Sequence, residues 1–129
     1  MKLILKTAFI LCLASNFSFS QDCNSIHVGK FKINDNKINL RTIIERTETE
    51  QIETNLNTGE TFTGSIEWID KCTYIFTYLK TNSKNPKYHF FVGKKMIVNI
   101  TNIKGDKIFF NCSIEEIDFE MSYFMTRIN

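Results

Sequence analysis

The sequence predicts an all-β fold, with about eight antiparallel strands in up-and-down order that form a small closed or half-open barrel. Apolar residues recur at every second position through most of the chain, which is the period of a half-buried strand. Short turn signals separate these runs. Short connections favour antiparallel neighbours, and closure of the sheet removes its free edges. A sandwich of two β-sheets is the alternative.

The N-terminal residues predict export. Two lysines precede the apolar stretch 7–13 (TAFILCL), which is too short to span a bilayer, and small or polar residues follow it up to Ser20. We therefore expect a signal peptide over 1–20, cut after Ser20, and a single β domain over 21–129. The mature chain should be secreted or periplasmic and should contain no transmembrane segment.

The first strand, 28–33, ends at the turn-forming residues 34–36 (NDN). The stretch after it is harder to interpret, because ERTETEQIE (45–53) alternates like a strand and yet holds five charges. One continuous strand would place Arg46, Glu48 and Glu50 on the same buried face, which is costly unless every charge is paired.

A hairpin resolves this conflict. Residues 39–46 and 51–56 are then two short strands, and the solvated tip holds 47–50 (TETE). On this interpretation Arg46 and Glu53 could meet across the hairpin or at the barrel mouth. The expected inward residues are Leu40, Thr42 and Ile44 in one strand and Ile52, Thr54 and Leu56 in the other.

Aromatic residues dominate the next two strands, 60–69 and 72–80. Turn signals at 57–60 (NTGE) and 70–71 (DK) delimit them. Their expected inward faces carry Phe62, Ile66 and Trp68, and Tyr74, Phe76 and Tyr78.

Three further strands complete the barrel. A long connection, 82–94, precedes them; it includes Pro86 and Gly93, and we expect a short helical turn around 88–92. The strands are 95–103, 107–114 and 117–127, and KGD (104–106) is a tight turn between the first two. Their expected inward residues are Met96, Val98 and Ile100; Ile108, Phe110, Cys112 and Ile114; and Ile117, Phe119, Met121, Tyr123 and Met125.

The mature chain keeps three cysteines, an odd number, in an oxidising compartment. We expect a disulfide between Cys23 and Cys72, because it would attach the N-terminal segment to the middle of the sheet. Cys112 lies in an alternating apolar run and is expected to be a buried free thiol. The cysteines are single and far apart, so no metal site is expected.

Several short motifs resemble a group of small secreted proteins of Bacteroidota-type bacteria that have no established function. The motifs are VGKF (28–31), RTETEQIE (46–53), IEWIDKCTYIFTY (66–78) and VGKKMIVNI (92–100). The positions that match the group's pattern are Gly29, Phe31, Arg46, Gln51, Glu53, Trp68, Cys72, Tyr74 and Gly93. A weaker similarity, in the opening Gly29-Lys30-Phe31, is to lipocalin-like barrels, and it implies their architecture only.

The net charge and the motifs present argue against two classes of function, nucleic-acid binding and catalysis. The chain has 16 basic and 14 acidic residues, and two lysines leave with the signal peptide, so the mature chain is neutral. A neutral chain without a basic cluster has no electrostatic surface for nucleic acid. Only His27 and His89 could serve as catalytic bases, and no nucleophile motif accompanies them. We expect no enzyme, no catalytic residues and no cofactor.

The candidate ligand-binding residues are the polar group of the charged hairpin and the aromatic residues beside it. An arginine, an amide and a carboxylate could orient a polar ligand group, and aromatic side chains could line a cavity. The same residues could instead set the hairpin register and fill the core. The six candidates are Arg46, Gln51, Glu53, Trp68, Tyr74 and Tyr78.

The sequence is consistent with two functions. The leading hypothesis is an exported, non-enzymatic barrel that binds a small apolar or amphipathic ligand. The alternative is a structural or interaction protein of the cell envelope, with a packed interior and an envelope protein as its partner.

Overall fold

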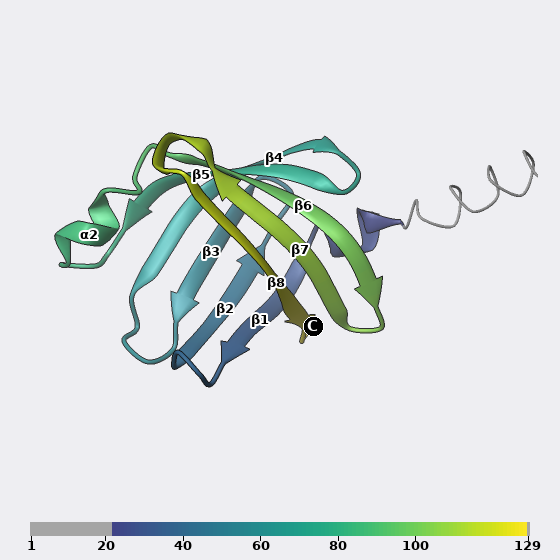
Figure 1. Cartoon of the computed structure of the whole chain (residues 1–129), viewed down its shortest axis with the longest axis horizontal. Helices are drawn as coiled ribbons and strands as arrows, with labels where there is room; N and C mark the ends of the chain where they lie inside the picture. Colours follow the sequence, from purple (N-terminus) through teal and green to yellow (C-terminus); the bar gives the residue numbers. More distant parts are fainter. Residues whose placement is uncertain (1–21, 129) are drawn as a thin grey trace, which may run out of the picture.

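A computed structural model describes residues 22–128 and shows an all-β protein (Figure 1). The expected signal peptide, 1–20, lies outside the described residues. No helix within 22–128 is long and apolar enough to cross a bilayer. The elements are η1 (Cys23–Ile26), β1 (Gly29–Asp35), β2 (Leu40–Arg46), β3 (Glu50–Asn55), β4 (Thr61–Asp70), β5 (Thr73–Thr81), α2 (Pro86–His89), β6 (Lys95–Lys104), β7 (Lys107–Ile114), η2 (Glu115–Ile117) and β8 (Phe119–Arg127).

The eight strands form a closed barrel in chain order. Each strand pairs antiparallel with the next, and β1 pairs with β8 to close the sheet. This confirms the predicted up-and-down barrel over the sandwich, and every strand begins and ends within two residues of its expected bounds. The short helix in the long connection, α2, begins two residues before the expected turn, because Pro86 is at its first position and the Asn85 side chain accepts a hydrogen bond from the Lys87 N–H.

The two ends of the barrel differ. At one end, which we call the closed end, η1 lies beside the β2–β3, β4–β5 and β6–β7 turns. The Cys23–Cys72 disulfide joins η1 to the β4–β5 turn there, as predicted. The other end, the open end, carries the remaining connections: 36–39, 56–60, 82–94 and 115–118.

Apolar side chains fill the barrel along most of its length. Phe31 and Phe76 are completely buried, and Cys112 is a buried free thiol, as predicted. The alternation read from the sequence therefore identified most of the core. The buried apolar residues are Cys23, Ile26, Phe31, Ile44, Ile66, Tyr74, Phe76, Tyr78, Val98, Ile108, Phe110, Cys112, Ile114 and Met125.

The β2–β3 hairpin forms as predicted, but β3 turns its other face inward. The buried Ile44 of β2 lies opposite Glu53, and Arg46 lies opposite Gln51. Because directly opposed residues share a face of the sheet, Gln51 and Glu53 point into the barrel.

The expected inward stripe of Ile52, Thr54 and Leu56 is therefore wrong, and Leu56 is 46% exposed. The prediction assumed that a charged side chain would be too costly to bury at this point. Arg46 is nevertheless only 3% exposed. Its burial is possible because hydrogen bonds formed by other parts of the fold compensate it, as described below.

A second difference concerns the first half of β8. Phe119 and Met121 have the inward alternation that was predicted, but each is 38% exposed. The reason is that β1 does not reach them: it pairs with β8 only through Phe31–Arg127 and Lys32–Thr126. The barrel wall is therefore thin between β1 and β8 at the open end.

Gly64 in β4 allows close packing inside the barrel. It lies between Gln51 and Tyr78 in the sheet, next to a register shift. A Cβ atom there would overlap the ring of Phe76 and the carbonyl oxygen of Thr77. A backbone oxygen cannot move aside as a flexible side chain can, so only glycine fits without rearrangement.

We predict that Gly64→Ala lowers the free energy of unfolding by about 1–3 kcal/mol, through overpacking. Urea unfolding followed by tryptophan fluorescence measures the loss. The control is Ser65→Ala, one residue along the strand and on its opposite face, which should change stability by less than about 0.5 kcal/mol. Equal stabilities for the two variants would contradict the packing argument.

Candidate ligand-binding site

The six candidate residues lie on β2, β3, β4 and β5, and their register places all of them on the inner face of the barrel. They fall into two groups along the barrel axis. Arg46, Gln51, Trp68 and Tyr74 lie toward the closed end, and Glu53 and Tyr78 lie toward the open end. The two groups have different environments.

Arg46 is the centre of the first group. Its Nε–H donates to Oε1 of Gln51 at 2.8 Å, and its two terminal nitrogens donate to the carbonyl oxygen of Ile26 and to the Tyr74 hydroxyl, each at 2.9 Å. Gln51 is 1% exposed and Tyr74 is 2% exposed. The guanidinium thus joins β2, β3, β5 and η1 through one buried hydrogen-bond network.

Aromatic rings complete the environment of Arg46. Its guanidinium carbon lies 4.7 Å from the ring centre of Tyr74, 5.0 Å from that of Phe31 and 5.9 Å from that of Trp68. Such contacts stabilise a desolvated cation by up to about 2 kcal/mol each. A cation without a carboxylate in direct contact is therefore stable in this core.

Trp68 and His27 cover the network at the closed end. Their rings stack with centres 3.5 Å apart, and His27 Nε2 lies 2.8 Å from the carbonyl oxygen of Lys71. The Trp68 indole N–H is buried and has no hydrogen-bond partner among the described residues. Trp68 as a whole is half-buried, and its stacked pair with His27 covers this end of the barrel.

Glu53 is the acidic residue of the second group, and it lies on the inner face of the barrel. The sequence suggested that it could meet Arg46, but Gln51 lies between them, and its amide Nε2 donates to Oε2 of Glu53 at 3.2 Å. Glu53 is partly buried. Burial raises the pKa of its carboxyl to about 7, against the smaller lowering by the Gln51 hydrogen bond and the Arg46 charge.

Apolar side chains surround this carboxyl. Phe62 is the cross-strand neighbour of Glu53, and its ring centre lies 5.4 Å from Tyr78 and 6.4 Å from Phe91. The Tyr78 hydroxyl contacts the Met96 sulfur at 3.8 Å. Phe62, Phe91 and Met96 pack against the core but are only partly buried, so apolar surface remains accessible here.

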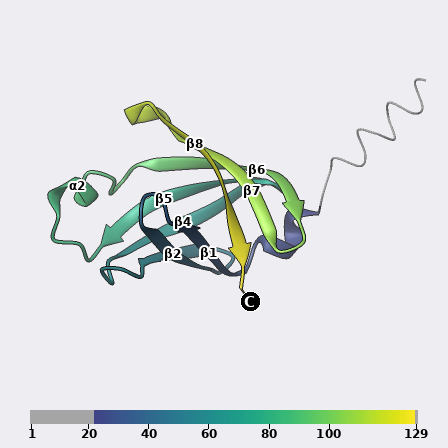
Figure 2. The same cartoon turned by 60° about the horizontal axis from the view of Figure 1, so that its bottom comes forward.

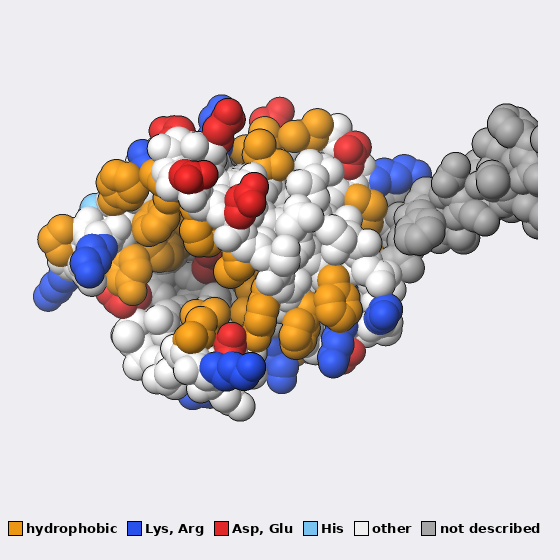
Figure 3. Space-filling view, viewed as in Figure 1, with side chains coloured by type: hydrophobic (Ala, Val, Ile, Leu, Met, Phe, Trp, Pro, Cys, Tyr) orange, Lys and Arg blue, Asp and Glu red, His pale blue; other side chains and the backbone are white. Residues whose placement is uncertain are grey.

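The space-filling view shows the molecule hollowed beside α2, at the open end (Figure 3). Hydrophobic side chains border the hollow, and an acidic side chain is visible in its depth. The connection that carries α2 is held to β5 by two backbone hydrogen bonds. The N–H of Gly93 donates to the Tyr78 carbonyl oxygen, and the Tyr78 N–H donates to the Lys94 carbonyl oxygen.

Sequence reasoning missed three of the partly buried apolar residues in this half of the barrel. Phe62 and Met96 were expected to point inward but were not selected as site residues, since nothing distinguished them from other core positions. Phe91 lies in the long connection, outside any alternating run. Only the folding of that connection onto β5 brings its ring to 5.7 Å from Tyr78.

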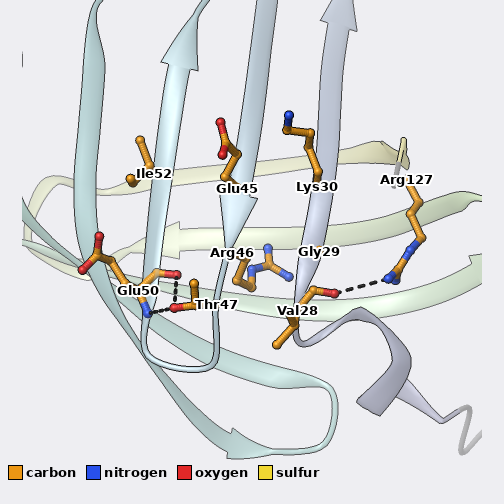
Figure 4. A pocket seen from close by; sticks show the side chains of 9 residues that line it. All are labelled: Val28, Gly29, Lys30, Glu45, Arg46, Thr47, Glu50, Ile52 and Arg127. Atoms are coloured by element: carbon orange, nitrogen blue, oxygen red, sulfur yellow. Dashed lines mark hydrogen bonds between the residues drawn. The ribbon is translucent and has the colours of Figure 1, made fainter.

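A second concavity lies on the outer surface, beside the closed end. This groove of about 620 Å³ is formed by β1, β2, β3 and the end of β8 (Figure 4). It carries Lys30 and Arg127 together with Glu45 and Glu50. Charges of both signs line it, so it favours no single class of ligand.

Both histidines contact backbone oxygens. His27 lies against the Lys71 carbonyl as described, and His89 Nε2 lies 2.6 Å from the Ser83 carbonyl oxygen. The Ser83 hydroxyl donates to Glu60. These contacts position loops, and the absence of enzymatic activity stays a prediction.

No family model, no curated protein and no solved structure matches this chain. The similarity to small secreted proteins of Bacteroidota-type bacteria therefore stays a prediction. The class of protein that the structure defines is a small all-β closed barrel, with the Cys23–Cys72 disulfide in its described residues.

We predict that Arg46→Met lowers the free energy of unfolding by about 3–5 kcal/mol, because it leaves Gln51, the Ile26 carbonyl and the Tyr74 hydroxyl without their buried donor. Chemical denaturation measures the change. Arg41→Met, on the exposed face of the same strand, is the matched control and should cost less than about 0.5 kcal/mol. Similar losses in both variants would refute the central role of the network.

We also predict that stability falls as pH rises from about 4.5 to about 7, and is unaffected by Glu53 above that range. The folded state keeps the Glu53 proton up to a pKa of about 7, whereas the unfolded chain loses it near 4.5, so deprotonation favours unfolding in between. Glu53→Gln should remove about 1–3 kcal/mol of this dependence. Unfolding free energies at pH 5 and pH 8 test it; an unchanged pH slope in the variant would contradict the assignment.

Proposed function

We propose that this chain is an exported, non-enzymatic β-barrel protein that binds a small amphipathic ligand in the hollow at its open end. The apolar part of the ligand would contact Phe62, Phe91 and Met96. Its polar group would meet Glu53. Export is supported by the N-terminal sequence and by the disulfide, which is typical of an oxidising compartment.

The observation that carries this proposal is a single carboxyl group, that of Glu53, on the inner face of the barrel opposite the partly buried Phe62. Ligand sites combine a mostly apolar lining with a few polar groups that orient the ligand. Glu53 receives one hydrogen bond, from Gln51, and its other oxygen has no protein partner among the described residues. Among the described residues, Trp68 Nε1 is the only side-chain polar atom that is both fully buried and unpaired. The unpaired oxygen of Glu53 is therefore not fully buried.

The state of this carboxyl limits the chemistry of the ligand. Below its pKa of about 7 the protonated group can donate a hydrogen bond, so it suits an acceptor such as a carbonyl, hydroxyl or carboxylate oxygen. Above that pKa it would repel an anionic ligand. An amphipathic molecule with an apolar body and an acceptor at one end fits both features.

The packing at the closed end supports the alternative, a structural or interaction protein of the cell envelope. Phe31, Ile44 and Tyr74 are almost completely buried there, and the Arg46 network leaves no accessible polar group. If the hollow serves only as the base of a protein interface, the partner would be an envelope protein and no small molecule would bind.

Titration of the exported protein with oleate, haem and anilinonaphthalene sulfonate tests the proposal. We expect saturable binding of at least one of them at pH 5, and an affinity that falls by up to about tenfold by pH 8.5, as Glu53 ionises. Glu53→Gln should bind the same ligand with no such fall. Calorimetry or dye fluorescence measures both.

The control is Glu45→Gln, which removes an exposed carboxylate on the outer face of β2 and should behave like the wild type. Absence of binding by all three probes would exclude the ligand-binding version and favour the envelope-protein alternative. Binding with the same pH dependence in wild type and Glu53→Gln would place the site elsewhere.

A further inference from the structure

The first half of β8 has a backbone edge that no strand pairs with, and its side-chain contact with β1 is the hydrogen bond from the Tyr123 hydroxyl to the Asn34 carbonyl oxygen at 3.0 Å. The ladder between β8 and β1 contains only Phe31–Arg127 and Lys32–Thr126, and β1 ends at Asp35. The ladder between β8 and β7 continues without interruption to Phe119. Both cartoon views show the beginning of β8 standing apart from β1 (Figures 1 and 2).

The direction of the backbone groups along this edge follows from two hydrogen bonds. The Arg127 N–H donates to Asp106, on the β7 side, and the Ile128 N–H donates to Lys30, on the β1 side. Successive residues of a strand point their N–H and C=O groups to alternate sides. The backbone groups of Glu120, Ser122 and Phe124 therefore point away from β7, toward the free edge.

This edge has few of the features that usually prevent strands from pairing, and its charged side chain is Glu120. Lysine, proline and bulges protect natural edges, and β1 carries Lys30 and Lys32. The segment 119–126 (FEMSYFMT) has no lysine, proline or glycine, and its ladder with β7 has no register shift. Phe119 and Met121 also leave 38% of their surfaces exposed beside it.

We propose that β8 pairs antiparallel with β8 of a second copy of this chain, across a twofold axis at Met121. The sheet would then run continuously from β7 and β8 of one protomer into β8 and β7 of the other. Such a contact is self-complementary, as a twofold dimer requires. This proposal goes beyond the proposed function and does not depend on it.

The register centred on Met121 is the one that fits the free segment. It places Phe119 opposite Tyr123 and Glu120 opposite Ser122, so that no like charges meet. A register centred on Glu120 would oppose two glutamates. One centred on Ser122 would pair Phe119 with Met125, which is 2% exposed and lies next to the part of β8 that β1 covers.

Sedimentation equilibrium of the exported protein tests the proposal. We expect twice the chain mass for the wild type and the chain mass for Met121→Lys, because two lysines would face each other at the axis. Asn111→Lys is the matched control: it adds the same charge at an exposed position on the outer face of β7, and it should remain dimeric. Circular dichroism confirms that each variant is folded.

A cross-linking experiment tests the register. Met121 would face Met121 of the other copy at a non-hydrogen-bonded position, where Cα atoms are about 4.5 Å apart, a distance within the range of a disulfide. Met121→Cys should therefore give a covalent dimer under mild oxidation, and Ser122→Cys should not. A monomeric wild type, a dimer that survives Met121→Lys, or cross-linking through Ser122→Cys alone would overturn the proposal.

Discussion

The burial of the Arg46 cation is the constraint on which the rest of this barrel depends. A guanidinium at this depth is stable only if each of its nitrogens has a partner, and the three partners come from η1, β3 and β5. They must therefore assemble together. The disulfide supports this assembly, because it holds η1 at the β4–β5 turn and so keeps the Ile26 carbonyl in place.

The same network divides the barrel into two halves of different character. Toward the closed end the Arg46 guanidinium has its hydrogen-bond partners and the aromatic rings pack around it, and the Trp68 indole N–H is a buried donor without a partner among the described residues. Toward the open end Gln51 donates one hydrogen bond to Glu53, and the polar residues that follow on the inner face of β2 and β3, Thr42 and Asn55, are uncharged. The ligand hypothesis therefore rests on one carboxyl and the apolar wall around it, while the rest of the polar cluster is structural support.

Particular residues show where sequence reasoning succeeded and where it failed. The period-two pattern placed the strands because side-chain alternation is a local property of extended backbone. It failed at β3, where the stripe that begins with Ile52 was expected inside and the face that carries Gln51 and Glu53 points inward instead. The failure has a physical cause: the cost of burying Arg46 depends on the Tyr74 hydroxyl and the Ile26 carbonyl, 28 and 20 residues away in the chain. For the same reason Phe91, in a connection without periodicity, could not be assigned to the site.

The amino-acid sequence alone predicted the all-β class, the order of the strands and their bounds to within two residues, the hairpin with its tip at 47–50, and the cysteine pair. The first three follow from local alternation and turn chemistry, and the cysteine pair follows from the need to attach the N-terminal segment to the sheet. Only the tertiary structure decided which face of β3 points inward, where β1 stops covering β8, and which apolar residues remain accessible around Glu53. Those features depend on long-range hydrogen bonds and on the relative lengths of neighbouring strands, and local sequence patterns contain neither.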